Sequence, residues 1–219
     1  MDKLRLRFEK TGRAVYISHL DLMHTMQRAF SRAGYRLKYS EGFNPHPNIS
    51  APLPLSVGTA SICDVLDFKL TEDVDLNELP ARLTAAMPEG IVIKECYEPE
   101  RKATELKYLE VEGRYEYDER PLQDMASALR DFYAADEIVI TRKTKRGEGE
   151  SDIRPAIRSI DISAGAEHVT VRAVISAQEP TLNPDLLVAA LRQKAPEIAP
   201  DFAQFTRLET YCNNMEIFR

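Results

Sequence analysis

Residues 18–50 contain the densest run of structural signals in the chain and most restrict how it can fold. Ser18 and Asp21 have the spacing of a capping box, with Asp21 in the place of the usual glutamate. Apolar side chains then recur at helical spacing, and Gly34 stands where a left-handed residue commonly ends a helix. The apolar stripe consists of Leu22, Met23, Met26, Ala29, Phe30 and Ala33. This pattern predicts one amphipathic helix that begins at Ser18 and ends near Gly34.

A short strand and a conformationally restricted loop are expected after this helix. Residues 35–40 alternate between apolar or aromatic and basic side chains, which is the period of a half-buried strand. In residues 40–47, Gly42 permits a left-handed turn, and prolines stand on both sides of His46. Each proline fixes its own φ and pushes the preceding residue toward extended geometry. The backbone of His46 is therefore expected to have few accessible conformations.

The order of elements predicts the fold of the first half. Residues 3–8 alternate charged and apolar side chains as a half-buried strand does. After the helix and strand described above, we expect a strand over 60–70, a helix over 76–87 and a strand over 91–97. The resulting order, β-α-β-β-α-β, is that of ferredoxin-like domains. The charged, proline-containing residues 98–102 are expected to be a linker.

A similar order of elements begins again after the linker. The elements expected there are strands over 106–117, 137–141, 169–176 and 205–213, helices over 121–133 and 184–194, a charged loop or hairpin tip over 143–152, and a strand or short helix over 153–162. We therefore predict an α+β protein with two ferredoxin-like halves and antiparallel sheets. The expected domains are residues 1–98 and 104–219.

Composition excludes several classes of protein. The chain has 219 residues and a net charge of −6, and it contains no run of the roughly 18 apolar residues that a membrane span needs. No apolar segment follows the charged N-terminus, so a secretory signal is not expected. Cys63, Cys96 and Cys212 are odd in number and far apart, and we expect them to be reduced thiols in a cytoplasmic protein.

The positive charge is uneven and predicts a nucleic-acid surface. Basic residues are concentrated in 1–50 and 142–158, whereas the acidic excess lies in 64–137. Cationic side chains bind phosphates, and exposed aromatic rings stack on bases. The candidate nucleic-acid-binding residues are Arg5, Arg7, Arg28, Arg32, Arg36, Lys38, Phe43, Asn44, Lys143 and Arg154. Two solvated strands and a mobile hairpin would explain the same charges.

Three of the four histidines lie within residues 18–50 and offer a second kind of site. If the 42–47 loop folds back over the start of the helix, His19 and His46 approach each other beside Asp21. Histidine exchanges protons near neutral pH, so these three residues are the candidate catalytic groups. In the competing interpretation, His19 is hydrogen-bonded locally in the first helical turn and His46 packs within its loop.

No sequence motif for a metal or a cofactor is present. The chain has no CxxC, HxxxH or HExxH motif, and the two-residue spacing of His19 and Asp21 suits shared ligation poorly. The glycine-rich motifs of dinucleotide and nucleotide sites, GxGxxG and GxxxxGK[ST], are also missing. We therefore expect no metal and no cofactor. Without a three-cysteine cluster for an iron–sulfur centre, the chain itself is not expected to be a radical enzyme.

Several segments resemble those of a bacterial domain of unknown function that accompanies radical SAM enzymes. The matching segments are SHLDL at 18–22, YSEGFNPHP at 39–47, PLSVG at 54–58 and the Lys143–Pro155 region, and His24 departs from the pattern at a position that is often basic. That domain occurs beside, or fused to, a cobalamin-binding-type radical SAM protein. Its genes lie near those for an E/G-type ribonuclease and large-subunit ribosomal proteins, so the resemblance implies RNA or ribosome maturation as the setting. A doubled ferredoxin-like arrangement is also similar to that of CRISPR repeat-RNA endonucleases.

Two functional hypotheses follow. In the first, the chain is an accessory protein of a radical SAM enzyme and recognises RNA or a ribosome-related substrate. In the second, it is a metal-independent enzyme that processes RNA or a small anionic substrate with His19 and His46 as general acid and base. The sequence determines neither whether the protein is an enzyme nor its oligomeric state.

Overall fold

The computed structural model describes residues 3–144 and 147–219, and the chain divides into two compact units. The first unit consists of Met1–Glu105 with Phe218–Arg219, and the second of Leu106–Ile217. The expected second domain ran to residue 219, but the last two residues belong to the first unit. The described chain has a mixed α+β fold with four α-helices and largely antiparallel strands. None of these helices is long and apolar enough to cross a lipid bilayer.

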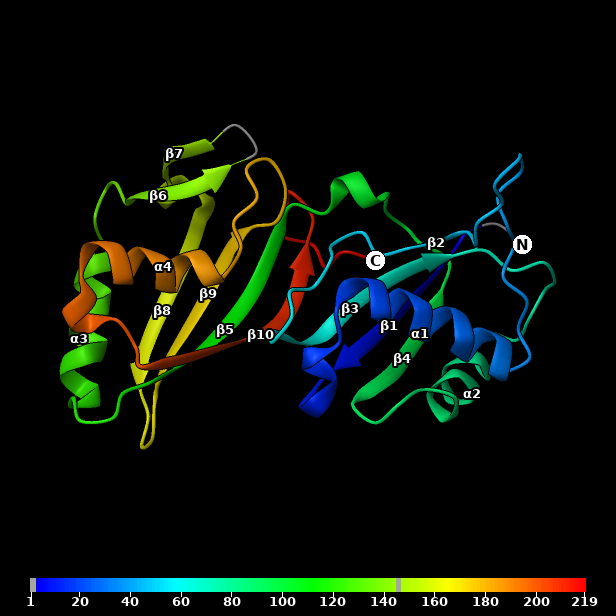
Figure 1. Ribbon diagram of the computed structural model, residues 1–219, viewed down its shortest axis with the longest axis horizontal. Coiled ribbons are helices and arrows are strands. Elements are labelled where there is room, and N and C mark those ends of the chain that lie inside the picture. Colours follow the sequence, from blue (N-terminus) through cyan, green and yellow to red (C-terminus); the bar gives the residue numbers. More distant parts are fainter. Residues whose placement is uncertain (1–2, 145–146) are drawn as a thin grey trace. The chain divides into compact units, whose positions relative to one another are not determined.

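An antiparallel sheet with two helices forms the first unit. Its elements are β1 (Leu4–Lys10), α1 (His19–Arg32), β2 (Ile49–Ser50), β3 (Ala60–Phe68), α2 (Leu79–Ala85) and β4 (Ile91–Tyr97), with a 3₁₀ helix at Gly12–Tyr16. The strands are adjacent in the order β4, β1, β3, β2, and each neighbouring pair is antiparallel. Both helices lie on one face of these strands (Figure 1).

The core of the first unit lies between the sheet and its helices. Leu6 and Phe8 of β1 and Met26 and Phe30 of α1 are at most 1% exposed. Burying a side chain of this size contributes about 1.5–3 kcal/mol, so the alternating strand and the helical stripe stabilise each other. The rings of Phe30 and Phe68 pack with their centroids 4.8 Å apart, which fixes the C-terminal half of α1 over the end of β3.

The strand expected over 35–40 is reduced to isolated bridges, one of which pairs Tyr39 with Pro47. The strand that pairs with β3 is instead β2, which has only two residues. Proline has no amide hydrogen to donate to a ladder, so Pro47 and Pro52 limit the strand between them. The prediction of a full second strand was therefore wrong.

The helix expected over 76–87 is shorter at both ends, because it begins at Leu79 and ends at Ala85. The amide of Asn77 donates to Asp75 Oδ1 (2.8 Å), which holds the chain in a turn before the helix. Beyond the helix the chain turns at Gly90, which has a φ of +88°.

The second unit has a four-stranded antiparallel sheet and a separate hairpin. Its elements are β5 (Tyr108–Glu116), α3 (Leu122–Tyr133), β6 (Val139–Thr144), β7 (Gly147–Asp152), β8 (Ile157–Ala164), β9 (Val169–Ser176), α4 (Asp185–Lys194) and β10 (Phe202–Tyr211). The sheet has the order β10, β5, β9, β8. The two helices lie on one side of it (Figure 1), and the Tyr133 hydroxyl donates to the Leu187 carbonyl (3.0 Å).

A loop or a hairpin tip was expected over 143–152, and the structure has a hairpin there: β7 occupies most of that segment and pairs with β6. The strand expected over 137–141 lies in this hairpin and not in the four-stranded sheet. Asp152 explains where the hairpin ends, since its Oδ1 accepts the amides of Ile138 and Arg154 (both 2.9 Å). The next sheet strand, β8, starts only after this turn.

Candidate nucleic-acid interface

The start of α1 is closed by the predicted capping box. The Ser18 hydroxyl donates to Asp21 Oδ2 (2.7 Å), and the Asp21 amide donates to Ser18 Oγ (3.2 Å). These bonds satisfy an amide that the helix leaves without a partner, and they confirm the predicted cap. Asp21 therefore supports the helix start. Beside it, Nδ1 of His19 is buried and has no hydrogen-bond partner among the described residues.

His46 lies at the opposite end of α1 from His19. His46 and Phe68 line the same pocket, and Phe68 packs on Phe30 near the end of the helix. α1 has 14 residues, and a helix of that length spans about 20 Å. Figure 1 shows the 40–48 loop beyond the C-terminal end of α1. The expected approach of His19 and His46 is therefore wrong, because the chain after α1 returns along the edge of β3 and does not fold back over the helix.

Backbone hydrogen bonds hold the base of the 40–48 loop against the end of β3. The amide of Lys38 donates to the carbonyl of Lys69 (2.8 Å), and the amide of Lys69 donates to the carbonyl of Asn48 (3.0 Å). The amide of Asn48 in turn donates to the carbonyl of Lys38 (2.8 Å). These three bonds fix the two ends of the loop, whereas the side chains of residues 41–46 are exposed.

Ser40 orients the imidazole of His46. Ser40 Oγ accepts the backbone amide of His46 (3.0 Å) and lies 3.0 Å from its Nδ1. Nδ1 also lies 3.4 Å from the carbonyl oxygen of Asn44, which can only accept, so these contacts fit either tautomer of the ring. Nε2 has no hydrogen-bond partner among the residues that the structure describes. It donates a hydrogen bond in the Nε2–H tautomer and in the imidazolium form.

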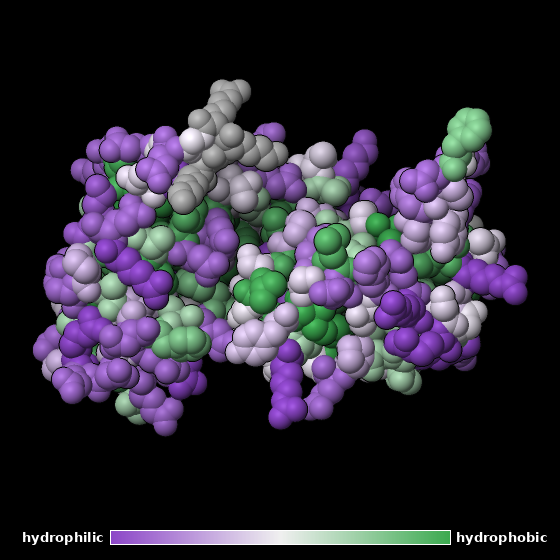
Figure 2. Space-filling model, in the orientation of Figure 1, coloured by the Kyte–Doolittle hydropathy of each residue, from purple (hydrophilic) through white to green (hydrophobic). Residues whose placement is uncertain are grey.

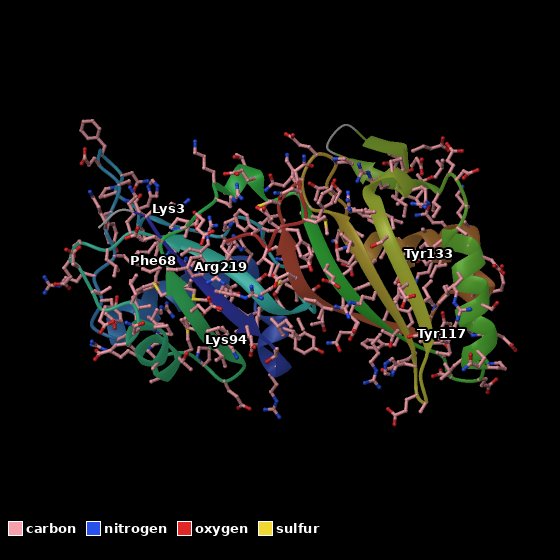
Figure 3. All side chains as sticks on the ribbon, turned by 180° about the vertical axis from the view of Figure 1, so that it is seen from behind. Lys3, Phe68, Lys94, Tyr117, Tyr133 and Arg219 are labelled. Atoms are coloured by element: carbon pink, nitrogen blue, oxygen red, sulfur yellow. The ribbon has the colours of Figure 1, made fainter. Side chains whose placement is uncertain are left out.

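His46 lines a small pocket at the edge of β2 and β3, which we call the His46 pocket. Its volume is about 270 Å³, and its lining consists of Lys3, His46, Pro47, Asn48, Ile49, Ser50, Asp67, Phe68 and Lys69. Lys3 and Phe68 are labelled in Figure 3. The lining combines an apolar floor with amide, imidazole and ammonium groups, which suits a small polar ligand.

The charges around the His46 pocket leave a positive excess. The carboxylate of Asp67 is 1% exposed and accepts hydrogen bonds from Nε and Nη2 of Arg5 (2.6 and 3.1 Å). Nζ of Lys3 lies 2.5 Å from the same carboxylate. Lys69 is half-buried and forms no ion pair with any other described residue. Asp67 is thus fully compensated, and the ammonium of Lys69 is not.

A larger groove, the arginine–tyrosine groove, lies between the last turns of α1 and the segment that follows. Its volume is about 770 Å³, and it is lined by Gln27, Arg28, Ser31, Gly34, Tyr35, Arg36, Leu37, Tyr39 and Thr71. Arg28 and Arg36 are exposed, and Tyr39 is 54% exposed. Burial raises the pKa of Tyr35, and Arg82 beside its ring opposes that shift. The groove therefore presents two guanidinium groups and the exposed phenol ring of Tyr39.

The tip of the 40–48 loop presents an unpacked aromatic ring. Phe43 is fully exposed, and the neighbouring Asn44 is exposed as well. In Figure 2 this loop ends in a pale green, hydrophobic tip above more hydrophilic neighbours. Such a ring contributes nothing to the core, and exposed rings of this kind stack on nucleobases.

Arg5 does not contribute to an exposed basic face, although it was predicted to. It is 0% exposed, because its partner in the β1–β3 register is Asp67 and its guanidinium lies 4.3 Å from the ring centroid of Phe218. The C-terminal residues, including Arg219 in Figure 3, lie at this face of the first unit. Arg7, two residues further along β1, is half-buried.

Arg154 has a structural role. Its Nε donates to the carbonyl of Ala135 (3.1 Å), and its Nη1 donates to the carbonyl of Ile157 (3.0 Å). These bonds tie the exit of the hairpin to the segment after α3. Lys143 is opposite Glu148 in the hairpin register, and its side chain lies outside the described part of the structure.

The remaining predicted cations lie around the end of α1. Arg28, Arg36 and Lys38 are exposed. Arg32 is exposed too, but its Nη2 donates to the Ala86 carbonyl (2.6 Å) and so satisfies the last turn of α2. The structure therefore brings together Arg28 and Arg36 in the groove, with Lys38 next to it in sequence.

The three thiols are at least partly buried. Burial raises the pKa of the Cys96 thiol to about 12, so this thiol is protonated at neutral pH. Cys63 and Cys212 are buried. Within residues 3–144 and 147–219, no three side chains of His, Cys, Asp or Glu are grouped to hold a metal ion.

Residues 3–184 match the model of the family described as "Uncharacterized protein conserved in bacteria (DUF2344)". The chain belongs to this family. The matched segment contains every residue of the arginine–tyrosine groove and of the His46 pocket. A comparison with curated proteins finds no match.

Solved structures similar to this DUF2344 chain share little sequence with it. A chain in the crystal structure of a Cbf5-Nop10-Gar1 complex has a TM-score of 0.52 and 9% identity, over 94% of this chain and 48% of that chain. This chain thus spans about half the length of that one, and the likeness shows a shared fold alone. An unknown protein from Galdieria sulphuraria (TM-score 0.27, 10% identity, 94% and 97% covered) and CRISPR endoribonuclease Cse3 bound to a 19-nucleotide RNA (0.20, 13%, 94% and 99%) are more distant.

Sequence reasoning misses part of the candidate interface in this DUF2344 member. Lys69 of the His46 pocket was not among the predicted site residues. It lies beside Asn48 because β2 pairs with the end of β3, which aligns Ile49 with Phe68. The sequence offers one signal for this site, a lysine at the end of an apolar strand. A lysine in that position usually points into solvent and has no functional role.

Proposed function

We propose that this protein recognises RNA, or a ribosome-related substrate that contains RNA, as an accessory protein of a radical SAM enzyme. The observation that carries the RNA part is the arginine–tyrosine groove, where Arg28, Arg36 and Tyr39 border one open space. Guanidinium groups bind phosphates, and phenol rings stack on bases without regard to sequence. We propose that the bound RNA is single-stranded, because the bases of a duplex are already stacked on one another and cannot stack on a protein ring.

The charge distribution supports this interface on an acidic protein. The whole chain has a net charge of −6, which disfavours nonspecific adhesion to nucleic acid. The groove itself has two arginines and no acidic residue in its lining. Phe43 at the loop tip adds a ring for a further base. A local site of this kind is expected to bind one segment of an RNA and not to bind nonspecifically along its whole length.

RNA binding is tested by fluorescence anisotropy with a labelled, unstructured RNA. We expect affinity to fall steeply between about 50 and 200 mM salt, because binding releases counterions. The Arg28→Ala/Arg36→Ala variant should bind more weakly, and its salt slope should decrease by about 2, one for each lost phosphate contact. Arg13→Ala, which removes an exposed arginine from the 3₁₀ helix before α1, is the matched control. Equal salt slopes in both variants would contradict the proposal.

The partnership with a radical SAM enzyme is supported by the resemblance of the SHLDL, YSEGFNPHP and PLSVG segments. We expect the protein to co-purify with the radical SAM protein encoded beside it, and to do so after nuclease treatment. If nuclease treatment abolishes the co-purification, the two proteins are held together by RNA. No association in either condition would remove this part of the proposal, whatever the result with RNA.

We also propose that both units are ferredoxin-like. The observed strand orders support this, because β4, β1, β3, β2 and β10, β5, β9, β8 have the same 4-1-3-2 arrangement when the strands of each sheet are numbered along the chain. In the second unit the β6–β7 hairpin is then an insertion between α3 and β8. Faces of such sheets serve many functions, so the fold itself assigns none.

A further inference from the structure

The His46 pocket differs from the arginine–tyrosine groove in size and in composition. Its volume is about 270 Å³ compared with about 770 Å³ for the groove. Small-molecule sites begin at about 300 Å³, and this pocket is slightly smaller, so its size suits a phosphate group at a chain end and not a run of nucleotides. Its apolar floor includes Ile49 and Phe68, and its polar groups come from the loop and from both flanking strands.

The polar groups of this pocket are donors suited to an anion. The ammonium of Lys69 has no ion-pair partner within the described chain, and Nε2 of His46 has no hydrogen-bond partner there. Lys3 contacts Asp67 and still has further N–H donors, since an ammonium has three. Asp67 does not repel an anion strongly, because the buried guanidinium of Arg5 neutralises it from behind.

We propose that the His46 pocket binds a nucleotide with a phosphate monoester, such as the phosphorylated end of an RNA. This inference extends the proposed function, because it assigns a chain end to a second site near the groove. A monoester has a charge of about −1.5 to −2 at pH 7 and three acceptor oxygens, whereas an internal diester has one negative charge. Lys3, Lys69 and His46 match the monoester in charge and in donors.

The test compares RNAs of one sequence that differ only at their ends. The probes have a 5′-phosphate, a 3′-phosphate or only hydroxyl ends, and a free nucleoside 5′-monophosphate is measured separately. We expect one phosphorylated RNA to bind at least about tenfold more tightly than the hydroxyl-ended RNA, since only the monoester offers Lys69 a charge-assisted hydrogen bond. Lys69→Ala should remove that preference and leave hydroxyl-ended RNA bound as before.

Lys94→Ala is the matched control, because Lys94 lies on β4 in an exposed ion pair with Glu9 (3.1 Å) (Figure 3). If Lys69→Ala does not fold, His46→Gln tests the same pocket through an exposed loop residue. Equal affinity for all RNA ends, with no binding of the mononucleotide, would overturn the inference and leave RNA recognition by the groove intact. Binding of the mononucleotide without any RNA binding would support the pocket and overturn the proposed function.

Discussion

Asp67→Ala is expected to destabilise the first unit by about 3–5 kcal/mol, because it leaves a buried guanidinium without a counter-charge. Arg5 is 0% exposed, and Asp67 accepts two hydrogen bonds from it, at 2.6 and 3.1 Å. The ring of Phe218 covers the same guanidinium and excludes water from it. Urea unfolding followed by circular dichroism measures the loss in free energy of unfolding.

Two comparisons make this result specific to the buried ion pair. Lys94→Ala breaks the exposed Lys94–Glu9 pair on the neighbouring strands and should cost no more than about 1 kcal/mol. The double variant Arg5→Met/Asp67→Leu should recover most of the stability that Asp67→Ala loses, since apolar residues replace buried ion pairs with little penalty. A similar loss for Lys94→Ala and Asp67→Ala would show that burial does not determine the cost.

Gly90→Ala is expected to have the second-largest effect on stability. Gly90 has a φ of +88°, a conformation that costs a side-chain-bearing residue about 1–3 kcal/mol. An added Cβ would also overlap the backbone oxygen of Thr11 and lie 2.9 Å from Cβ of Ala14. Overpacking of this kind adds about 1–3 kcal/mol, because the Thr11 amide is itself held by the Gly90 carbonyl (2.8 Å) and cannot move away.

Gly58→Ala measures the cost of the positive φ without the steric overlap of the added Cβ. Gly58 has nearly the same φ, +87°, but an added Cβ there would have no neighbour within 4 Å. It should therefore show only the backbone cost of about 1–3 kcal/mol. The difference between the two variants in thermal and urea unfolding is the cost of the overlap. Equal losses would mean that the contact between Gly90 and the segment around Thr11 and Ala14 is loose.

Local signals in the sequence predicted the first helix well. The capping box of Ser18 and Asp21 depends on residues three apart, and the buried stripe from Leu22 to Phe30 depends on helical periodicity. Both are properties of one segment. The alternation in β1 was equally clear, and Leu4, Leu6 and Phe8 are buried as it predicted.

The same reasoning failed where a residue's role depends on a distant partner. Arg5 was taken for a solvent-exposed cation because it alternates with leucines, but its register partner is an aspartate 62 residues away. The sequence also contains no sign that the guanidinium of Arg154 binds two backbone carbonyls. Charge pattern cannot distinguish these cases, because a buried ion pair and an exposed cation look alike within one strand.

The sequence by itself determined the α+β class, the capped first helix and the restricted geometry of the loop around His46, because each follows from local sterics, capping and periodicity. Only the tertiary structure decided where that loop lies. The pairing of β2 with the end of β3 moved His46 away from His19 and placed it beside Lys69. The physical reason is that strand pairing depends on hydrogen bonds between segments far apart in the chain, and no local pattern encodes their register.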